Sequence, residues 1–298
     1  MDYFSGKRLS NKLKTIFIAI RPWSFSASIT STFLGYLLAW KFNGAIDSIQ
    51  VLFTTASILF IHGAGNLVNT YYDFANGFDT KDSDDKTLVK RDLTPKEIAA
   101  CIGEFYFLGM LSFLVVYLHS EVNNISLVCL FLSGVLSSFV YTGGIGLKYI
   151  AFGDVLIFLT FGFLTTAFAY FAHTGKLSME IISYALPMAL NTEAILHGNN
   201  TRDLESDKSA GGITLAILLG KRNACILYCL LLMIPYAVLG FLAFNSSWTL
   251  LLPLVTVPLA VGLSAKCFRG DLVLIPQGTA QLNLLFGFLY LTGLALAP

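Results

Sequence analysis

The chain has 298 residues, of which 55% are hydrophobic and only 12% are charged, and its mean hydropathy is +0.71. Soluble domains carry about a quarter charged residues, so this composition excludes an ordinary soluble protein and indicates one embedded in the lipid bilayer. A net charge of +1 gives no electrostatic reason to expect nucleic acid as a partner.

Nine apolar segments are each long enough to cross a bilayer, which takes about 20 residues in a helix. In chain order they are residues 15–40, 49–75, 97–119, 124–142, 150–173, 179–200, 223–244, 247–265 and 277–297. The apolar run 213–220 is too short to span, and we expect a cap or interfacial turn there. The sequence therefore predicts an all-α bundle of nine transmembrane helices with cytoplasmic cap loops, formed by residues 15–298 after a basic segment, residues 1–14.

The basic residues indicate the orientation of this bundle. With nine spans, the N-terminus and the loops after the second, fourth, sixth and eighth spans share one side, and this side holds 17 of the 19 Lys and Arg residues, all but Lys41 and Lys176. Cytoplasmic loops carry such an excess, so we expect a multi-pass protein with a cytoplasmic N-terminus. Residues 1–14 lack the apolar core of a cleaved signal peptide, and we expect none.

The first polar motif lies at the cytoplasmic end of the second span, where Asn69 and Asp73 are four residues apart and share one face of a helix. Asp79 follows soon after Gly77, a residue that can turn the chain back. Charges in such loops usually form a solvated face. Asn and Asp, however, are poor helix formers and costly at a membrane boundary unless used, so we expect this motif to bind a ligand.

The second motif follows the sixth span and contains Asn199, Asp203 and Asp207, which recur every four residues. On a helix each lies about 40° around from the last, so all three project from one stripe. We expect the two stripes to face each other across the bundle. Carboxylate and amide oxygens suit Mg²⁺, which prefers a few carboxylates together with substrate phosphate oxygens. The pattern therefore predicts Mg²⁺ as a cofactor, bridged to a diphosphate.

Basic and aromatic side chains near both motifs complete this hypothesis. We expect Lys148, in a Gly-rich loop after the fourth span, to hold the diphosphate and to act as a catalytic residue with Asp73 and Asp203. Tyr72 and Tyr141 adjoin the motifs, and their ring faces could stabilise a developing carbocation. Further cations close to the motifs are Lys81, Lys86, Lys90, Arg91, Arg202 and Lys208.

Five blocks of sequence carry a family resemblance: Arg21–Ser28, His62–Phe74, Ser83–Val89, Tyr141–Tyr149 and Asn199–Asp203. They resemble the UbiA superfamily of intramembrane prenyltransferases, and most closely its animal members that make menaquinone-4. The resemblance runs from Arg21 to the C-terminus. It implies a nine-helix fold with an Asn/Asp motif after the second helix and an Asp motif after the sixth.

The resemblance also implies roles for individual residues. Its Mg²⁺ ligands would be Asn69, Asp73, Asp79, Asn199, Asp203 and Asp207. It further implies diphosphate or substrate contacts for Lys86, Lys148 and Arg202. We also expect substrate contacts for Arg21, Tyr72, Tyr141 and Asn200. The chain departs from the family pattern in having Thr70 where many relatives have Asp, and in placing Asp79 six residues after Asp73. Asp84 or Asp85 could therefore complete the first metal site instead of Asp79.

The activity implied is the transfer of a prenyl group, geranylgeranyl, from its diphosphate to a naphthohydroquinone such as menadiol, giving menaquinone-4. Transfer to 1,4-dihydroxy-2-naphthoate is the nearest alternative, and an ion-coupled transporter or a non-catalytic isoprenoid sensor are alternatives of another class. The acidic stripes lie at one interface and not at the bilayer midplane, which argues against a transporter. By resemblance, the membrane is that of the endoplasmic reticulum or Golgi, or a mitochondrial one.

Overall fold

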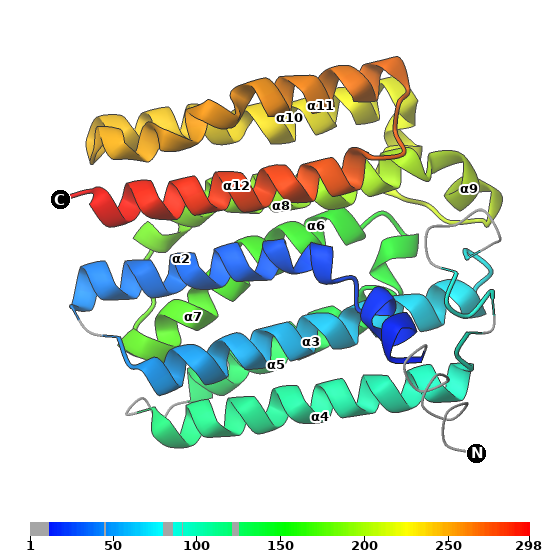
Figure 1. Cartoon of the computed structure of the whole chain (residues 1–298), viewed down its shortest axis with the longest axis horizontal. Helices are drawn as coiled ribbons and strands as arrows, with labels where there is room; N and C mark the ends of the chain where they lie inside the picture. Colours follow the sequence, from blue (N-terminus) through cyan, green and yellow to red (C-terminus); the bar gives the residue numbers. More distant parts are fainter. Residues whose placement is uncertain (1–11, 45, 80–85, 91, 121–124) are drawn as a thin grey trace.

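The computed structural model describes residues 12–44, 46–79, 86–90, 92–120 and 125–298, which form helices lying side by side along one axis (Figure 1). In chain order the elements are η1 (Pro22–Ser24), α2 (Phe25–Asn43), α3 (Ser48–Ala75), α4 (Pro95–His119), α5 (Ile125–Val140), η2 (Leu147–Tyr149), α6 (Gly153–Ile157), η3 (Phe158–Leu164), α7 (Thr165–Thr174), α8 (Glu180–Arg202), α9 (Leu204–Ser209), α10 (Leu215–Asn245), η4 (Trp248–Thr256), α11 (Val257–Arg269) and α12 (Ile275–Leu296). Among these described residues the one β-type contact is an isolated bridge between Ile150 and Ile213. The all-α prediction is confirmed.

Six rods of the described chain are long and apolar enough to cross a membrane: Ser48–Ala75, Pro95–His119, Gly153–Thr174, Leu215–Asn245, Trp248–Arg269 and Ile275–Leu296. The third of these is the continuous run of α6, η3 and α7, and the fifth joins η4 to α11. Helix α5 is apolar but shorter. These helices indicate a multi-pass membrane protein, while the predicted total of nine spans is not confirmed by length and hydropathy.

Helices α2 and α8 coincide with predicted spans but are less apolar, because they bury polar side chains. In α2 these are Ser26, Ser28, Thr30, Ser31 and Thr32, and in α8 they are Asn191, Thr192, Glu193, His197 and Asn200. A helix whose polar face is covered by its neighbours need not be apolar all round. Hydropathy therefore understates the helices nearest the polar interior.

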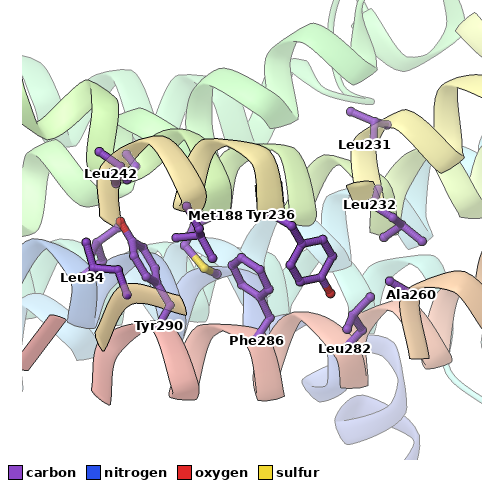
Figure 2. Packing of buried hydrophobic residues seen from close by; sticks show 14 of the residues in the cluster. Leu34, Met188, Leu231, Leu232, Tyr236, Leu242, Ala260, Leu282, Phe286 and Tyr290 are labelled. Atoms are coloured by element: carbon purple, nitrogen blue, oxygen red, sulfur yellow. The ribbon is translucent and has the colours of Figure 1, made fainter. Parts of the chain in front are cut away.

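Four clusters of buried apolar side chains hold the described part of the bundle together, and the two largest join most of its long helices. The larger joins α2, α8, α10, α11 and α12, and Figure 2 shows Phe286 of α12 beside Met188 of α8. The smaller joins α3, α4, α5 and α7 and includes Phe131. Helices α2 and α7 meet at Gly35, where an added Cβ would lie 2.5 Å from the carbonyl oxygen of Thr166. Glycine at this crossing lets the two helices approach closely.

The two ends of the bundle differ in character. Figure 1 shows α9 and the start of α4 at one end and the C-terminus at the other. At the C-terminal end, Lys41 donates to the carbonyl oxygen of Ala297. At the α9 end, Gly220 has φ 72° and ψ 159° and separates the first turns of α10 from its long remainder. The short apolar run 213–220 is thus a separate element before the span, as expected.

The charge asymmetry generates a test of orientation. In a variant lacking the native cysteines, Lys90→Cys and Lys208→Cys are expected to react with an impermeant thiol reagent from the cytoplasm, and Lys176→Cys only from the opposite side. All three lysines are exposed, so access does not limit the reaction. Labelling of the Lys90 and Lys208 positions from opposite faces would contradict the predicted topology.

Candidate functional site

A cavity of about 700 Å³ is lined by residues of α3, α5, η3, α7 and α8 and is polar at the α9 end. Predicted site residues that line it are Arg21, Asn69, Asp73, Asp79, Tyr141, Lys148, Asn199, Arg202, Asp203 and Asp207. The remaining wall is largely apolar and includes Ile58, Ile61, Leu130, Phe131 and Phe168. The structure therefore brings both polar motifs to one end of a single cavity whose other part suits a hydrocarbon chain.

Asp73 is the centre of the first half of the site. It lies in the last turn of α3 and is only 4% exposed. Lys148 Nζ donates to both of its carboxylate oxygens, at 2.7 and 2.9 Å, and the Tyr149 hydroxyl donates to Oδ1 at 2.8 Å. Gly144 and Gly146, both at φ 59°, turn the chain between α5 and η2 so that Lys148 can reach back to α3.

Asn69 links this carboxylate to the N-terminal part of the chain. With its amide oriented to satisfy both neighbours, Asn69 donates to Asp73 Oδ2 at 2.7 Å and accepts from the Arg21 guanidinium at 2.6 Å. Arg21 has a left-handed backbone with φ 51°, which is uncommon outside glycine and positions it just before η1. The first motif thus holds one carboxylate among two cationic side chains.

The second motif repeats this neutralisation at the end of α8. Arg202 donates from Nε and a terminal nitrogen to the two Asp203 oxygens, each at 2.7 Å, and also to Asn199 Oδ1 at 2.8 Å. Asp203 ends α8, and the amide of Asp207 in α9 donates to the Asp203 carbonyl at 2.8 Å. The predicted four-residue stripe therefore continues from α8 into α9 with only a small break.

Asp207 is the third acidic group that the fold brings together. Burial raises its pKa to about 6, the Lys148 charge opposes this shift, and the charges of Asp203 and Asp73 add to it. Asp73 belongs to the other motif and lines the same cavity as Asp207, so the two acidic stripes share one environment. Carboxylates gathered in this way favour a bound cation.

The structure places Asp79 where the sequence predicts a turn. Gly77 has φ 78°, and the amide of Asp79 donates to the Asp73 carbonyl at 3.2 Å. Asp84 and Asp85, the alternatives for the first metal site, lie outside the described residues. Lys86 is half-buried in the loop before α4 and is not part of the cavity lining.

Tyr72 also lies away from the cavity. Its ring packs edge-on against Tyr71 and Phe139, with centroids 5.4 and 6.2 Å apart. Its predicted contact with substrate is therefore not favoured by the geometry. Tyr141, in contrast, lines the cavity next to Lys148, whose amide donates to the Tyr141 carbonyl at 2.8 Å.

Asn200 belongs to a second polar cluster behind the cavity wall. It donates to Asp154 Oδ2 at 3.2 Å, and His197 Nδ1 lies 2.9 Å from Asp154 Oδ1. Asp154, Glu193 and His197 have possible ligand atoms within 4.8 Å of one another, and all are buried. From the sequence, Asn200 was predicted to contact the substrate, and Asp154 was not identified. The i, i+4, i+7 spacing of Glu193, His197 and Asn200 was the available signal for a shared face.

Comparison with known proteins agrees with this arrangement. Residues 28–273 match the UbiA prenyltransferase family. The chain is 46% identical over 297 residues to human UbiA prenyltransferase domain-containing protein 1, covering 100% of this chain and 88% of that protein. It is 47% identical over 290 residues to the Danio rerio protein of the same name, covering 97% of this chain and 86% of that one.

Solved structures show the same fold at low sequence identity. A UbiA homolog from Aeropyrum pernix K1 superimposes with a TM-score of 0.67 at 14% identity, covering 93% of this chain and 97% of that chain. A UbiA homolog from Archaeoglobus fulgidus, bound to GPP and Mg²⁺, has a TM-score of 0.59 at 16% identity, covering 93% of this chain and 99% of that chain.

The buried Asp207 generates a prediction about the metal-free protein. Because folding raises its pKa from near 4 to about 6, the folded state loses stability as pH rises between these values and keeps the full penalty above them. Asp207→Asn removes the penalty and is expected to raise the free energy of unfolding at pH 7.5 by on the order of 2 kcal/mol. The gain should shrink toward pH 4.5. Thermal unfolding with chelator at both pH values checks this, and an equal gain at both would contradict it.

Proposed function

Because the chain belongs to the UbiA prenyltransferase family, we propose that it transfers a geranylgeranyl group from its diphosphate to a ring carbon of a naphthohydroquinone such as menadiol, giving menaquinone-4. The observation that carries this proposal is the cavity itself. Two carboxylate motifs, each paired with a cation, meet at its polar end, and the rest of its wall is mostly apolar. A prenyl diphosphate is divided in the same way, into a charged diphosphate and an apolar hydrocarbon chain.

The donor set fits Mg²⁺. Asn69, Asp73, Asp79, Asn199, Asp203 and Asp207 offer hard oxygen atoms and all line the cavity. The raised pKa of Asp207 reflects burial beside other carboxylates, a charge distribution that a divalent cation would relieve. When bound there, Mg²⁺ would neutralise charge on the diphosphate and make it a better leaving group. An archaeal homolog bound to GPP and Mg²⁺ supports this choice of metal.

Lys148 and Arg202 are positioned to act on the leaving group. Asp73 and Asp203 hold the two cations at the cavity wall, and both cationic residues line the cavity. Both are therefore available to phosphate oxygens bound there. Such donors stabilise the negative charge that grows on a departing diphosphate.

The apolar wall limits what else can enter. Water would quench an allylic cation, and the Ile, Leu and Phe side chains of the wall offer water no hydrogen-bond partners where the hydrocarbon chain would lie. A volume of about 700 Å³ lies within the usual range for sites that enclose a small molecule. Tyr141 lines the cavity beside Lys148, so its ring is available to a cation forming near the diphosphate.

The charges of the lining favour an uncharged acceptor over a naphthoate. Among the described lining residues the basic ones are Arg21, Lys148 and Arg202, and all three pair with the polar motifs. An acceptor carboxylate placed deeper would lack a cation, which is costly in an apolar site. We further propose a cytoplasmic N-terminus, from the distribution of Lys and Arg, and, from the resemblance, an endoplasmic reticulum, Golgi or mitochondrial membrane.

The two acidic motifs can be tested by substitution in detergent-purified protein, with menadiol and geranylgeranyl diphosphate as substrates. Asp73→Asn and Asp203→Ala are each expected to lower turnover by about a hundredfold or more, since each removes a carboxylate at the metal and diphosphate end. Asn is used at position 73 because removing the whole side chain would leave Lys148 buried without a partner. More than about a tenth of wild-type activity in both variants would contradict the site. Ion flux without product would instead support a transporter.

The role of Lys148 can be separated from that of the acceptor site. Lys148→Gln is expected to reduce kcat/KM for geranylgeranyl diphosphate by about a hundredfold or more while changing the menadiol KM little, because the lost charge faces the leaving group. Lys86→Gln is the matched control, since Lys86 is not in the lining and should change neither value appreciably. A raised menadiol KM with unchanged donor dependence would assign Lys148 to the acceptor.

A further inference from the structure

The cavity-facing stripe of α3 changes in polarity along its length. Asp73, Asn69, Asn66, His62 and Ile58 follow one another at three- and four-residue intervals, and all five line the cavity. The stripe runs from a carboxylate through two amides and an imidazole to an aliphatic side chain. Amide and imidazole side chains of this stripe therefore extend deeper than a diphosphate site requires before Ile58 replaces them.

This polar segment lies at the depth expected for a second ligand that reacts with the prenyl diphosphate. Helix rise is about 1.5 Å per residue, so His62 lies about 10 Å below Asn69 along α3. The reacting carbon of a prenyl diphosphate is attached directly to the diphosphate, and an attacking ring must touch that carbon. The ring then lies one to two turns below the metal ligands, at the level of Asn66 and His62.

We propose that Ser24, His62 and Asn66 form the subsite for the aromatic acceptor, which takes an uncharged bicyclic phenol or hydroquinone through its hydroxyl group. The inference rests on the proposed prenyl transfer and names the acceptor side of that same cavity. Asn66 would accept the hydrogen bond, and His62 is a positioning residue that acts through its neighbours.

The hydrogen bonds around Ser24 determine which atoms remain for a ligand. The Ser24 hydroxyl donates to the Arg21 carbonyl at 2.8 Å, so its oxygen is an acceptor toward its other neighbours. Asn66 Nδ2 donates to this oxygen at 3.1 Å and to the Ile20 carbonyl at 2.7 Å. Both amide protons are thereby used. The Asn66 carbonyl oxygen is left as the acceptor for a substrate hydroxyl.

His62 is fixed in one neutral form by the same chain. Its Nε2 lies 3.1 Å from Ser24 Oγ, whose own proton is committed to Arg21, so Nε2 must be the donor. Its Nδ1 lies 2.6 Å from Ser28 Oγ and accepts that hydroxyl proton. The imidazole therefore holds Ser24 and, through it, the orientation of Asn66.

Aromatic rings on either side of His62 shape the subsite for a flat ligand. The His62 ring centroid lies 5.0 Å from Phe25 and 4.6 Å from Phe161. Phe161 belongs to η3, a π-helical segment within the rod of α6 and α7, and lines the cavity. Such segments redirect side chains at functional sites, and aromatic rings favour stacked or tilted contact with a second ring.

Two measurements on full-length protein test the subsite. Steady-state kinetics should show that His62→Phe and Asn66→Ala each raise the menadiol KM at least about tenfold, with the geranylgeranyl diphosphate KM changed less than about twofold. Leu52→Ala, on the exposed face of the same helix and outside the cavity lining, is the matched control and should leave the menadiol KM unchanged. In a Trp40→Phe, Trp248→Phe background, tryptophan fluorescence reports on Trp23 in the cavity lining, and its quenching by menadione should weaken in parallel without any turnover.

The outcomes separate this inference from the proposed function. Unchanged menadione binding, or a rise in the donor KM alone, would overturn the subsite while leaving prenyl transfer intact. A wild-type protein that forms no prenylated product from any aromatic diol would overturn the proposed function and the subsite with it. Thermal stabilisation by geranylgeranyl diphosphate and Mg²⁺ shows whether a variant is folded. If a variant is not folded, Ser24→Ala tests the subsite in its place, since it should raise the menadiol KM in the same way.

Discussion

The buried ion pair between Lys148 and Asp73 is the interaction on which the rest of the site depends. A carboxylate that is almost fully buried at a membrane edge is stable only with a cationic partner, and Lys148 meets both of its oxygens. The pair also ties the loop between α5 and α6 to the end of α3. Geometry of the catalytic end and stability of the bundle are therefore linked, and a variant that removes one partner affects both.

The second motif is stabilised by the same kind of ion pair, but its carboxylate is less buried. Asp203 is about one-third exposed at its side chain and is matched by Arg202, one residue earlier. Lys148 and Arg202 are both engaged by carboxylates, and burial raises the pKa of Asp207, to which the charges of Asp203 and Asp73 add. A divalent cation and a diphosphate would exchange these internal pairs for contacts with substrate. Before ligand binds, the ion pairs thus neutralise most of the carboxylate charge that the site holds at the membrane edge.

The gradient of polarity along α3 gives the cavity its direction. Charged groups at Asp73 give way to the amide and imidazole of Asn66 and His62 and then to the aliphatic Ile58. The proposed substrates follow the same order of polarity, from the charged diphosphate through the reacting ring to the hydrocarbon chain. In the proposed reaction this one helix face would order the three chemical parts, and Phe161 of the π-helical segment η3 lines the same cavity.

The sequence alone determined the membrane class, the all-α architecture and the composition of both polar motifs, because hydropathy and helical spacing are local properties. Asn69 with Asp73, and Asn199 with Asp203 and Asp207, were identified from four-residue intervals. Only the tertiary structure paired Lys148 with Asp73, 75 residues apart, and moved Asn200 to Asp154, 46 residues away. It likewise removed Tyr72 and Lys86 from the lining and brought Ser24 to His62. These contacts depend on which helices are neighbours and how they are rotated, and periodicity within one helix carries no information about the face that its neighbour presents.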